Sequence, residues 1–287
     1  MKKQQNNQGK YYAKERNPRR WLKPLLFTVT ALVFIVVLGV SLFMMHNESE
    51  EKQLQSLAAR TQTTAPTDAT TVPTETVQAT TVPTEATTIP TETQPPVILP
   101  QYAELYAQNQ EMYGWIQIDG TKIDYPVMYT PGEPEKYLHT GFDGSNSYPG
   151  VPFIDANCKP ESINLLIYGH NMPNGTMFRS LMKYQEKTFW QQHPTITFNT
   201  LYEEQEYEII AAFNDRVYYT RETGMFKFYQ FIDPETEEEF NSGIAAMKDK
   251  ALYDTGVTAE YGDKLITLVT CAYHTDHGRF VVVARRK

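Results

Sequence analysis

The feature that most constrains this chain is an uninterrupted apolar run at residues 25–45 (LLFTVTALVFIVVLGVSLFMM). It contains no charged residue, and only Thr28, Thr30, Gly39 and Ser41 break the apolar pattern. As a helix the run would be about 32 Å long, which matches a hydrocarbon core about 30 Å thick. The sequence therefore predicts a single transmembrane helix.

The charges on the two sides of this run differ in sign. Residues 1–24 contain eight lysines and arginines against one glutamate, whereas three glutamates lie among the six residues that follow the run. By the positive-inside rule, residues 1–24 form a cytoplasmic basic tail, and the chain after residue 45 is exported. We therefore expect a single-pass protein of the cell membrane. A cleavable signal peptide is the competing interpretation, although the apolar run is long for one.

Residues 46–100 are predicted to form an extracellular stalk without a fixed structure. From residue 61 to residue 96 the chain is almost wholly Thr, Pro, Ala, Glu, Gln and Val, and it contains no aromatic residue. An imperfect TT[VI]PTE repeat begins at Thr70, Thr80 and Thr87. Such a segment cannot bury enough apolar surface to offset the entropy lost on ordering. Its expected role is to hold a folded domain away from the membrane.

The remaining residues, 101–287, have the pattern of a folded, mostly β domain. Eight short segments rich in β-branched and aromatic residues are bounded by turn residues and predict strands. They are residues 115–118, 122–128, 150–154, 164–168, 195–199, 207–213, 265–270 and 279–284. Helices are expected at 102–112, at 176–183, and at 234–250 with Asp233 as its N-cap. Because closure removes sheet edges, we expect a β-barrel with helices inserted between its strands.

Charge and cysteine content exclude two classes of protein. The net charge is −8 and the positive excess is confined to residues 1–24, so the folded region has nothing to hold a polyanion and no nucleic-acid partner is expected. The two cysteines, Cys158 and Cys271, are too few for a disulfide-rich secreted scaffold or for a cysteine-based zinc module.

The C-terminal pair of predicted strands contains the residues with the most reactive chemistry. One strand ends at Cys271, residues 272–278 form a polar turn, and Arg279 opens the next strand. If the two strands pair as a hairpin, the thiol and the guanidinium lie at the same end. A nearby cation favours the thiolate and can hold an oxyanion. The alternative is a core cysteine beside a surface arginine.

A cysteine nucleophile also needs a base, and the chain has six histidines. His170 follows a strongly apolar strand and precedes a turn rich in Asn, Pro and Gly, a position from which it can project into a site. On this pattern alone, a loop histidine without a role is an equal alternative. His274 and His277 compete with it because they lie three and six residues after Cys271. Cys271, His274 and His277 could be zinc ligands, but they lack a fourth ligand at a recognisable spacing, so no metal site is expected.

Several motifs together resemble the sortases, the cysteine transpeptidases of Gram-positive cell surfaces. They are TLVTC (267–271), the arginine that opens RFVVVA (279–284), NLLIYGHNM (164–172), GWIQIDGTKIDYPVMY (114–129), KYLHTGFDG (136–144), GVPFID (150–155) and YDTGV (253–257). A helix before residue 114 and a helix shortly before the cysteine strand are similar to the class B subgroup. The resemblance covers residues 101–287, which would be the sortase catalytic domain.

The resemblance implies a closed eight-stranded β-barrel of the sortase type with an active site at one end. It implies that Cys271 is the nucleophile, His170 the general acid/base, and Arg279 the cation that stabilises the oxyanion or positions the substrate. The enzyme would cleave a C-terminal sorting motif of a surface protein through a cysteine thioester. It would then transfer the acyl group to an amine of the peptidoglycan precursor or of a pilin, and no cofactor is implied.

Two alternative functions and two departures from the family pattern stay open. The barrel could be a catalytically weak module that binds and assembles surface proteins, or a cysteine peptidase that releases its product to water. The short turn after Cys271 carries His274, Asp276 and His277, which the family pattern does not include. Cys158 lies outside the motifs, and it would disable the nucleophile if it formed a disulfide with Cys271. A buried thiol without a role is the expectation for Cys158.

Overall fold

The computed structural model describes residues 22–63 and 96–287. The chain divides into two units, Met1–Glu48 and Ser49–Lys287. Nearly all of the predicted basic tail, and residues 64–95 of the predicted stalk, lie outside the described residues.

The first helix, α1 (Leu22–Thr63), contains the whole predicted span and continues beyond it. Among the described helices it is the one that is long and apolar enough to cross a membrane, with a candidate span at Phe27–Gln62. The expectation that residues 46–63 lack a fixed structure is wrong, because they are helical. Leu57 and Ala58 lie three and four residues after Leu54, and all three are buried within the second unit. The periodic apolar residues therefore favour a helix in this segment, whereas the stalk prediction relied on composition.

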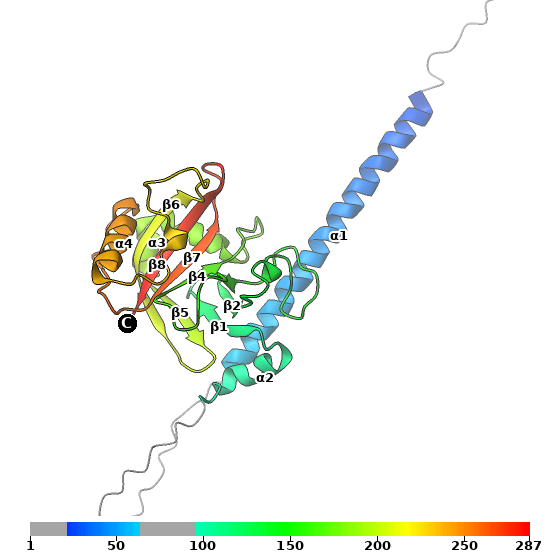
Figure 1. The fold of residues 1–287 in the computed structure, drawn as a ribbon. Helices are drawn as coiled ribbons and strands as arrows, with labels where there is room; N and C mark the ends of the chain where they lie inside the picture. Colours follow the sequence, from blue (N-terminus) through cyan, green and yellow to red (C-terminus); the bar gives the residue numbers. More distant parts are fainter. Residues whose placement is uncertain (1–21, 64–95) are drawn as a thin grey trace, which may run out of the picture. The chain divides into compact units, whose positions relative to one another are not determined.

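The second unit contains a closed β-barrel with the strand order β1-β2-β3-β4-β7-β8-β6-β5 (Figure 1). This confirms the expected eight-stranded barrel, and every predicted strand overlaps an observed one. The strands are β1 (Met112–Gln117), β2 (Asp124–Met128), β3 (Phe153–Ile154), β4 (Asn164–Tyr168), β5 (Thr195–Thr200), β6 (Glu206–Arg216), β7 (Leu265–Cys271) and β8 (Gly278–Arg286). Two of the pairings, β2 with β3 and β4 with β7, are parallel, and the others are antiparallel.

Helix α2 (Pro100–Gln108) precedes β1, and further helices and 3-10 segments connect the strands. The connecting elements are η2 (Lys136–Leu138), η3 (Phe178–Gln185), α3 (Lys187–Gln192), η4 (Phe228–Gln230) and α4 (Glu237–Lys250). The helix predicted at 102–112 ends four residues early, because Met112 already belongs to β1 and pairs with Met128. The helix predicted at 176–183 is the 3-10 segment η3 instead of an α-helix.

The helix predicted at 234–250 begins three residues later than expected, and Asp233 is not its N-cap. The N-cap is Thr236, whose hydroxyl accepts a hydrogen bond from the Glu239 N–H at 3.2 Å. The Asp233 carboxylate instead accepts hydrogen bonds from the Ser162 hydroxyl and the Ile163 N–H, both at 2.8 Å. Asp233 therefore holds the loop before β4, a long-range role that local capping rules do not reveal.

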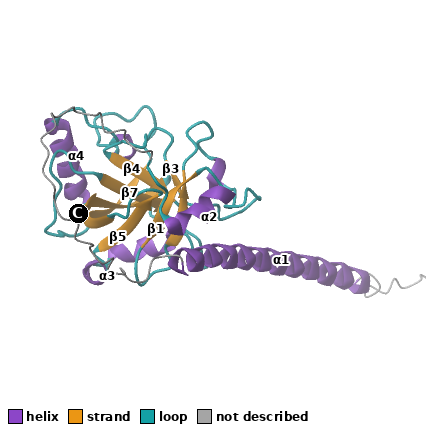
Figure 2. Ribbon diagram, turned by 90° about the horizontal axis from the view of Figure 1, so that it is seen from below, coloured by secondary structure: helices purple, strands orange, loops and turns teal. Residues whose placement is uncertain are grey.

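In β6, β7 and β8, side chains on both faces of the sheet are buried. Alternate side chains enter the barrel core, among them Ala212, Leu268 and Val282. The intervening side chains form a second apolar cluster with α4, which lies against the outside of the barrel (Figure 2). That cluster includes Phe213, Val269, Val281, Phe240, Ile244 and Met247. Burial on two faces fixes the register of β7 and β8, because a slip of one residue would exchange the two sets.

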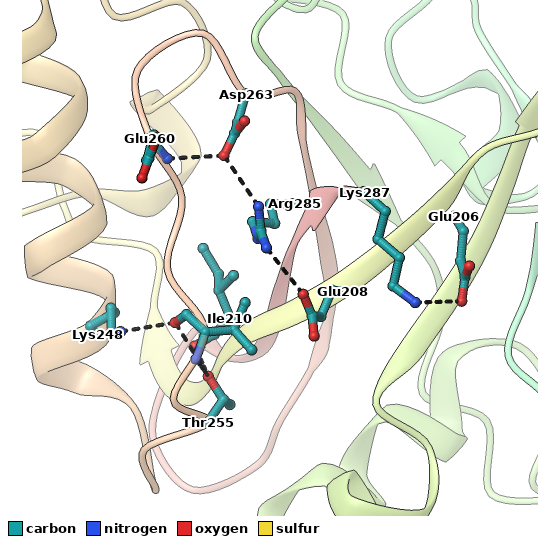
Figure 3. A network of polar contacts seen from close by, with 10 residues as sticks. Glu206, Glu208, Ile210, Lys248, Thr255, Glu260, Asp263, Arg285 and Lys287 are labelled. Carbon is teal, nitrogen blue, oxygen red and sulfur yellow. Dashed lines mark hydrogen bonds and ion pairs between the residues drawn. The ribbon is translucent and has the colours of Figure 1, made fainter.

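Polar contacts anchor the segment that leads from α4 into β7 (Figure 3). Arg285 on β8 contacts Glu208 on β6 at 3.2 Å and Asp263 at 3.8 Å. Nearer α4, the Thr255 hydroxyl donates to the Ile210 carbonyl at 3.0 Å, and Lys248 donates to the Val257 carbonyl at 2.8 Å. Partly exposed ion pairs contribute little stability one by one. Their effect here is to set the path of the chain as it enters the strand that ends at Cys271.

Replacing Gly243 by alanine is expected to destabilise the fold, although alanine is the better helix former. A Cβ at Gly243 in α4 would lie 2.2 Å from the buried Phe231 ring. The gain in helix propensity is about 1 kcal/mol, whereas overpacking costs about 1–3 kcal/mol. We expect Gly243→Ala to lower the urea midpoint of the detergent-solubilised chain, followed by circular dichroism. Ser242→Ala, at the exposed neighbouring position, should leave the midpoint unchanged or raise it slightly. A Gly243→Ala midpoint at or above that of the wild type would contradict the packing argument.

Candidate active site

Three neighbouring strands, β4, β7 and β8, bring the predicted site residues to one end of the barrel. Cys271 is the last residue of β7 and lies directly across from Arg279 on β8. On the other side of β7, Tyr168 of β4 lies beside Val269 in parallel register. The Gly169 N–H still donates to the Val269 carbonyl at 3.1 Å, so the pairing continues past the end of β4 toward His170.

The alternation of side chains places the three residues on one face of the sheet. Tyr168, Val269 and Val281 all contact the outer apolar cluster under α4. His170 and Cys271 each follow one of these residues by two positions, and Arg279 precedes Val281 by two. Residues two positions apart in a strand share a face. The expected hairpin is therefore confirmed, with Cys271 directly across from Arg279.

A cavity of about 590 Å³ opens over this face, and His170, Cys271 and Arg279 all line it. The other lining residues come from the loop around η2, from β3 and the residues that follow it, from the end of β4, from β7, and from Val217 and η4. They include Leu138, Phe153, Asp155, Tyr168, Val217 and Tyr229. The cavity thus combines an apolar floor with a thiol, an imidazole and a guanidinium, a composition suited to an extended peptide.

His170 is held by a loop that sequence reasoning did not assign to the site. Its Nε2 atom lies 3.0 Å from the Leu138 carbonyl oxygen, within hydrogen-bond distance. Its ring stacks on His139 at 5.4 Å and on Tyr148 at 6.4 Å between centroids. Burial lowers the pKa of His170, the hydrogen bond to the Leu138 carbonyl opposes this shift, and the neighbouring His139 lowers the pKa further. Leu138 and His139 belong to the KYLHTGFDG motif, which contributed to the family resemblance but did not predict that this loop contacts His170.

The two cysteines differ in their surroundings, and neither forms a disulfide. Cys271 is half-buried at the cavity, whereas Cys158 is buried and accepts a hydrogen bond from the Leu166 N–H at 3.5 Å. Leu166 pairs with Thr267, which is four residues and about 13 Å along β7 from Cys271. The Cys158–Cys271 disulfide is therefore not formed in this structure. Burial raises the pKa of Cys158 to about 12, so its thiol stays protonated and inert.

Arg279 lines the cavity, and the hydrogen bonds of its guanidinium among the described residues are to backbone carbonyls. Its Nη1 atom donates to the carbonyls of Gly278 at 2.9 Å and His277 at 3.3 Å. Within residues 22–63 and 96–287, no carboxylate forms an ion pair with this guanidinium. Backbone carbonyls orient the group but do not neutralise it. The remaining N–H donors can therefore bind an anionic or carbonyl oxygen in the cavity.

The two histidines of the turn after Cys271 are exposed and do not line the cavity. His277 has a φ of 55°, and its ring meets Tyr219 edge-on at 5.4 Å. Among the residues that the structure describes, no group of three or more His, Cys, Asp or Glu side chains could hold a metal ion. The turn itself is tight, because a Cβ at Gly278 would lie 2.2 Å from the Ala272 carbonyl oxygen.

Comparison with known proteins gives the same family by sequence and by structure. Residues 116–287 match the sortase domain family. The chain is 32% identical over 183 residues to sortase B of Listeria monocytogenes, an alignment that covers 62% of this chain and 71% of the relative. It is 27% identical over 192 residues to sortase B of Staphylococcus aureus, covering 66% of this chain and 75% of the relative.

Solved structures of sortase B superpose on the barrel. Sortase B from Bacillus anthracis in complex with AAEK1 gives a TM-score of 0.58 at 29% identity, covering 68% of this chain and 90% of that chain. Sortase B from Staphylococcus aureus gives 0.59 at 27% identity, covering 66% and 88%. The chain therefore belongs to the sortase family, among its class B members, and is a cysteine transpeptidase that acts on sorting motifs.

Proposed function

We propose that Cys271 is the nucleophile, His170 the general acid/base and Arg279 the oxyanion- or substrate-binding cation of a membrane-anchored sortase. The observation that supports this assignment best is the row formed by β4, β7 and β8, which aims all three side chains into one cavity. A thiol, an imidazole and a guanidinium can supply the nucleophile, the proton donor and the oxyanion donor for acyl transfer through a thioester.

The reaction proceeds in two halves. The Cys271 thiolate attacks the scissile carbonyl carbon of a sorting motif, and the resulting oxyanion is held by the Arg279 guanidinium. The C–N bond breaks while the His170 imidazolium gives its proton to the leaving amine, which produces a thioester. A second amine then attacks the thioester and gives its proton to the His170 imidazole, and the C–S bond breaks to regenerate the thiolate.

The first half-reaction requires the thiolate of Cys271 and the imidazolium of His170 in the same molecule. Burial lowers the pKa of His170 and so reduces the fraction of the imidazolium. The unpaired charge of Arg279 at the cross-strand position acts in the opposite direction, because a cation favours the thiolate.

The organisation of the chain suits substrates that are themselves at a membrane. We infer a cytoplasmic tail at residues 1–24, a membrane span at 25–45, a linker at 46–100 whose first part is helical, and a catalytic domain at 101–287 outside the cell. The donor would be a surface protein with a C-terminal sorting signal. The acceptor would be an amine of the peptidoglycan precursor or of a pilin. Anchoring enzyme and donor in one membrane raises their effective concentration.

Substitution of the two cysteines distinguishes the proposed nucleophile from the buried thiol. With a fluorogenic peptide copied from the sorting signal of a co-encoded surface protein, Cys271→Ala should lose all measurable cleavage. Cys158→Ala should keep wild-type kcat to within a few fold. Hydroxylamine added to the wild type should divert the product to a hydroxamate, because it captures the thioester. Cleavage by Cys271→Ala would refute the assignment, and release of free acid alone would indicate hydrolysis to water.

Lysine at position 279 tests the need for a planar cation. The Arg279 guanidinium donates to the Gly278 carbonyl through Nη1 and still has other N–H donors in the same plane, whereas an ammonium keeps the charge but has no such planar set of donors. We expect Arg279→Lys to reduce kcat/KM by about 10²–10³-fold, the loss typical of one oxyanion donor. Arg285→Lys, on the same strand but away from the cavity, is the matched control and should retain activity. Near-normal turnover by Arg279→Lys would contradict the role.

The pH profile tests the proposed acid. Burial and the neighbouring His139 lower the pKa of His170. The reactive pair of Cys271 and His170 holds one proton, so kcat/KM falls on the acid side where a second proton binds, and that pH follows the pKa of His170. The acid limb of kcat/KM should therefore lie below the ordinary histidine value of about 6.5. In His139→Gln the pKa-lowering effect of His139 is lost, so the limb should move to higher pH. An acid limb at or above about 6.5 in the wild type would be inconsistent with His170 in this environment.

A further inference from the structure

The parallel pairing of β4 and β7 does not end where the backbone of β4 ends. The Gly169 N–H donates to the Val269 carbonyl at 3.1 Å, one residue beyond β4. In a parallel ladder, every second residue of one strand donates to every second residue of its neighbour. The next position in this ladder would join the N–H of Asn171 to the carbonyl of Cys271.

The backbone leaves the ladder at this point, and a side chain takes its place. Asn171 forms an antiparallel bridge with Met177, and the Phe178 N–H donates to the His170 carbonyl at 2.9 Å. The side-chain amide of Asn171, through Nδ2, donates to the Cys271 carbonyl at 2.7 Å. The last position of the ladder is therefore made by a side chain.

The orientation of the Asn171 amide is determined by its second partner. Arg179 donates from Nη1 to Oδ1 of Asn171 at 3.0 Å. A guanidinium has donors only, so the atom that it contacts is the carbonyl oxygen, and the NH₂ group faces Cys271. Asn171 is only 6% exposed, so neither interaction is readily replaced by water. Arg179, by contrast, is an exposed residue of η3.

We propose that Asn171, oriented by Arg179, is a positioning residue that fixes the distance and angle between His170 and Cys271; this inference rests on the proposed function. The residues on both sides of His170 are hydrogen-bonded to β7, Gly169 to the Val269 carbonyl and Asn171 to the Cys271 carbonyl. The backbone of His170 is therefore held against the strand that ends in the thiol. The Thr270 hydroxyl adds a third tie, donating to the Gly169 carbonyl at 2.8 Å. Neither Asn171 nor Arg179 needs to touch the substrate.

The most direct test is Asn171→Asp, which keeps the size of the side chain and its acceptor for Arg179. It removes the donor and turns a carboxylate oxygen toward the Cys271 carbonyl, which repels it. A displacement of about 1 Å in a reacting group can cost about 10²-fold in rate. We therefore expect kcat to fall about 10–100-fold while KM stays within about two-fold, since the lining of the substrate cavity is unchanged.

Asn199→Asp is the matched control. Asn199 on β5 also donates from Nδ2, to the Tyr102 hydroxyl at 2.8 Å, but it does not line the cavity. The same change of one atom there should leave kcat within about two-fold of the wild type. Equal losses of kcat in Asn171→Asp and Asn199→Asp would show a general effect on the barrel and would overturn the inference.

Arg179→Met provides a second route that does not disturb a buried residue. Without its partner the Asn171 amide can rotate, so kcat should fall about 3–10-fold with KM unchanged. Because the two residues act through one hydrogen bond, Arg179→Met should cause no further loss of kcat in an Asn171→Ala background, where no side-chain amide is left to orient. Wild-type kcat in Arg179→Met would overturn the proposed coupling even if Asn171→Asp did not fold. Full additivity of the losses in Arg179→Met and Asn171→Ala would overturn it as well.

Cys271→Ala, assayed in parallel with the same fluorogenic peptide, distinguishes failure of the proposed function from failure of the positioning role of Asn171. If Cys271→Ala is inactive and Asn171→Asp retains wild-type kcat, the positioning role is wrong and the proposed function stands. If Cys271→Ala cleaves the peptide, the proposed function itself is wrong and the positioning role falls with it. Loss of kcat in Asn171→Asp, with KM and the Asn199→Asp control unchanged, supports both.

Discussion

The register of β7 with its two neighbours is the constraint on which the whole site depends. β7 pairs in parallel with β4 and antiparallel with β8, and these pairings bring His170 and Arg279 to the two sides of Cys271. A slip of one residue would turn the Cys271 side chain to the opposite face of the sheet. The apolar clusters on both faces of β7 prevent such a slip, because it would move Leu268 and Val269 into each other's environments. Core packing and the geometry of the site are thus set by the same contacts.

The electrostatics of the site follow from this architecture. His170 is desolvated under the loop that contributes Leu138, which opposes protonation, whereas Arg279 is oriented only by backbone carbonyls and keeps its charge available. One member of the group therefore resists a positive charge while another supplies one permanently. The proposed anchoring at a membrane would concentrate the enzyme with its donor.

Local patterns in the sequence predicted most of the fold, and the errors have physical causes. The eight strands were recognisable because each combines β-branched or aromatic residues with flanking turns, and the Cys271–Arg279 hairpin followed from its short turn. Asp233 was misassigned as a cap because its true partners, Ser162 and Ile163, are about seventy residues away in the chain. Composition did not predict the helix over residues 46–63, whereas the spacing of the buried residues Leu54, Leu57 and Ala58 is typical of one. For His170, spacing left two equal interpretations, and only resemblance to the sortases favoured one.

By itself, the sequence determined the features that depend on neighbours along the chain: the apolar span, the order of strands, and a thiol and a guanidinium at one end of a hairpin. Only the tertiary structure decided what lies beside His170. Leu138, which contacts the His170 ring, is 32 residues away in the chain, and Cys271, which contacts the side chain of Asn171, is 100 residues away from it. Parallel pairing of β4 with β7 leaves no local trace in the chain, since the intervening residues form η3, α3, β5, β6, η4 and α4. Free energy gained by burying both faces of β7 selects that pairing, and with it the site.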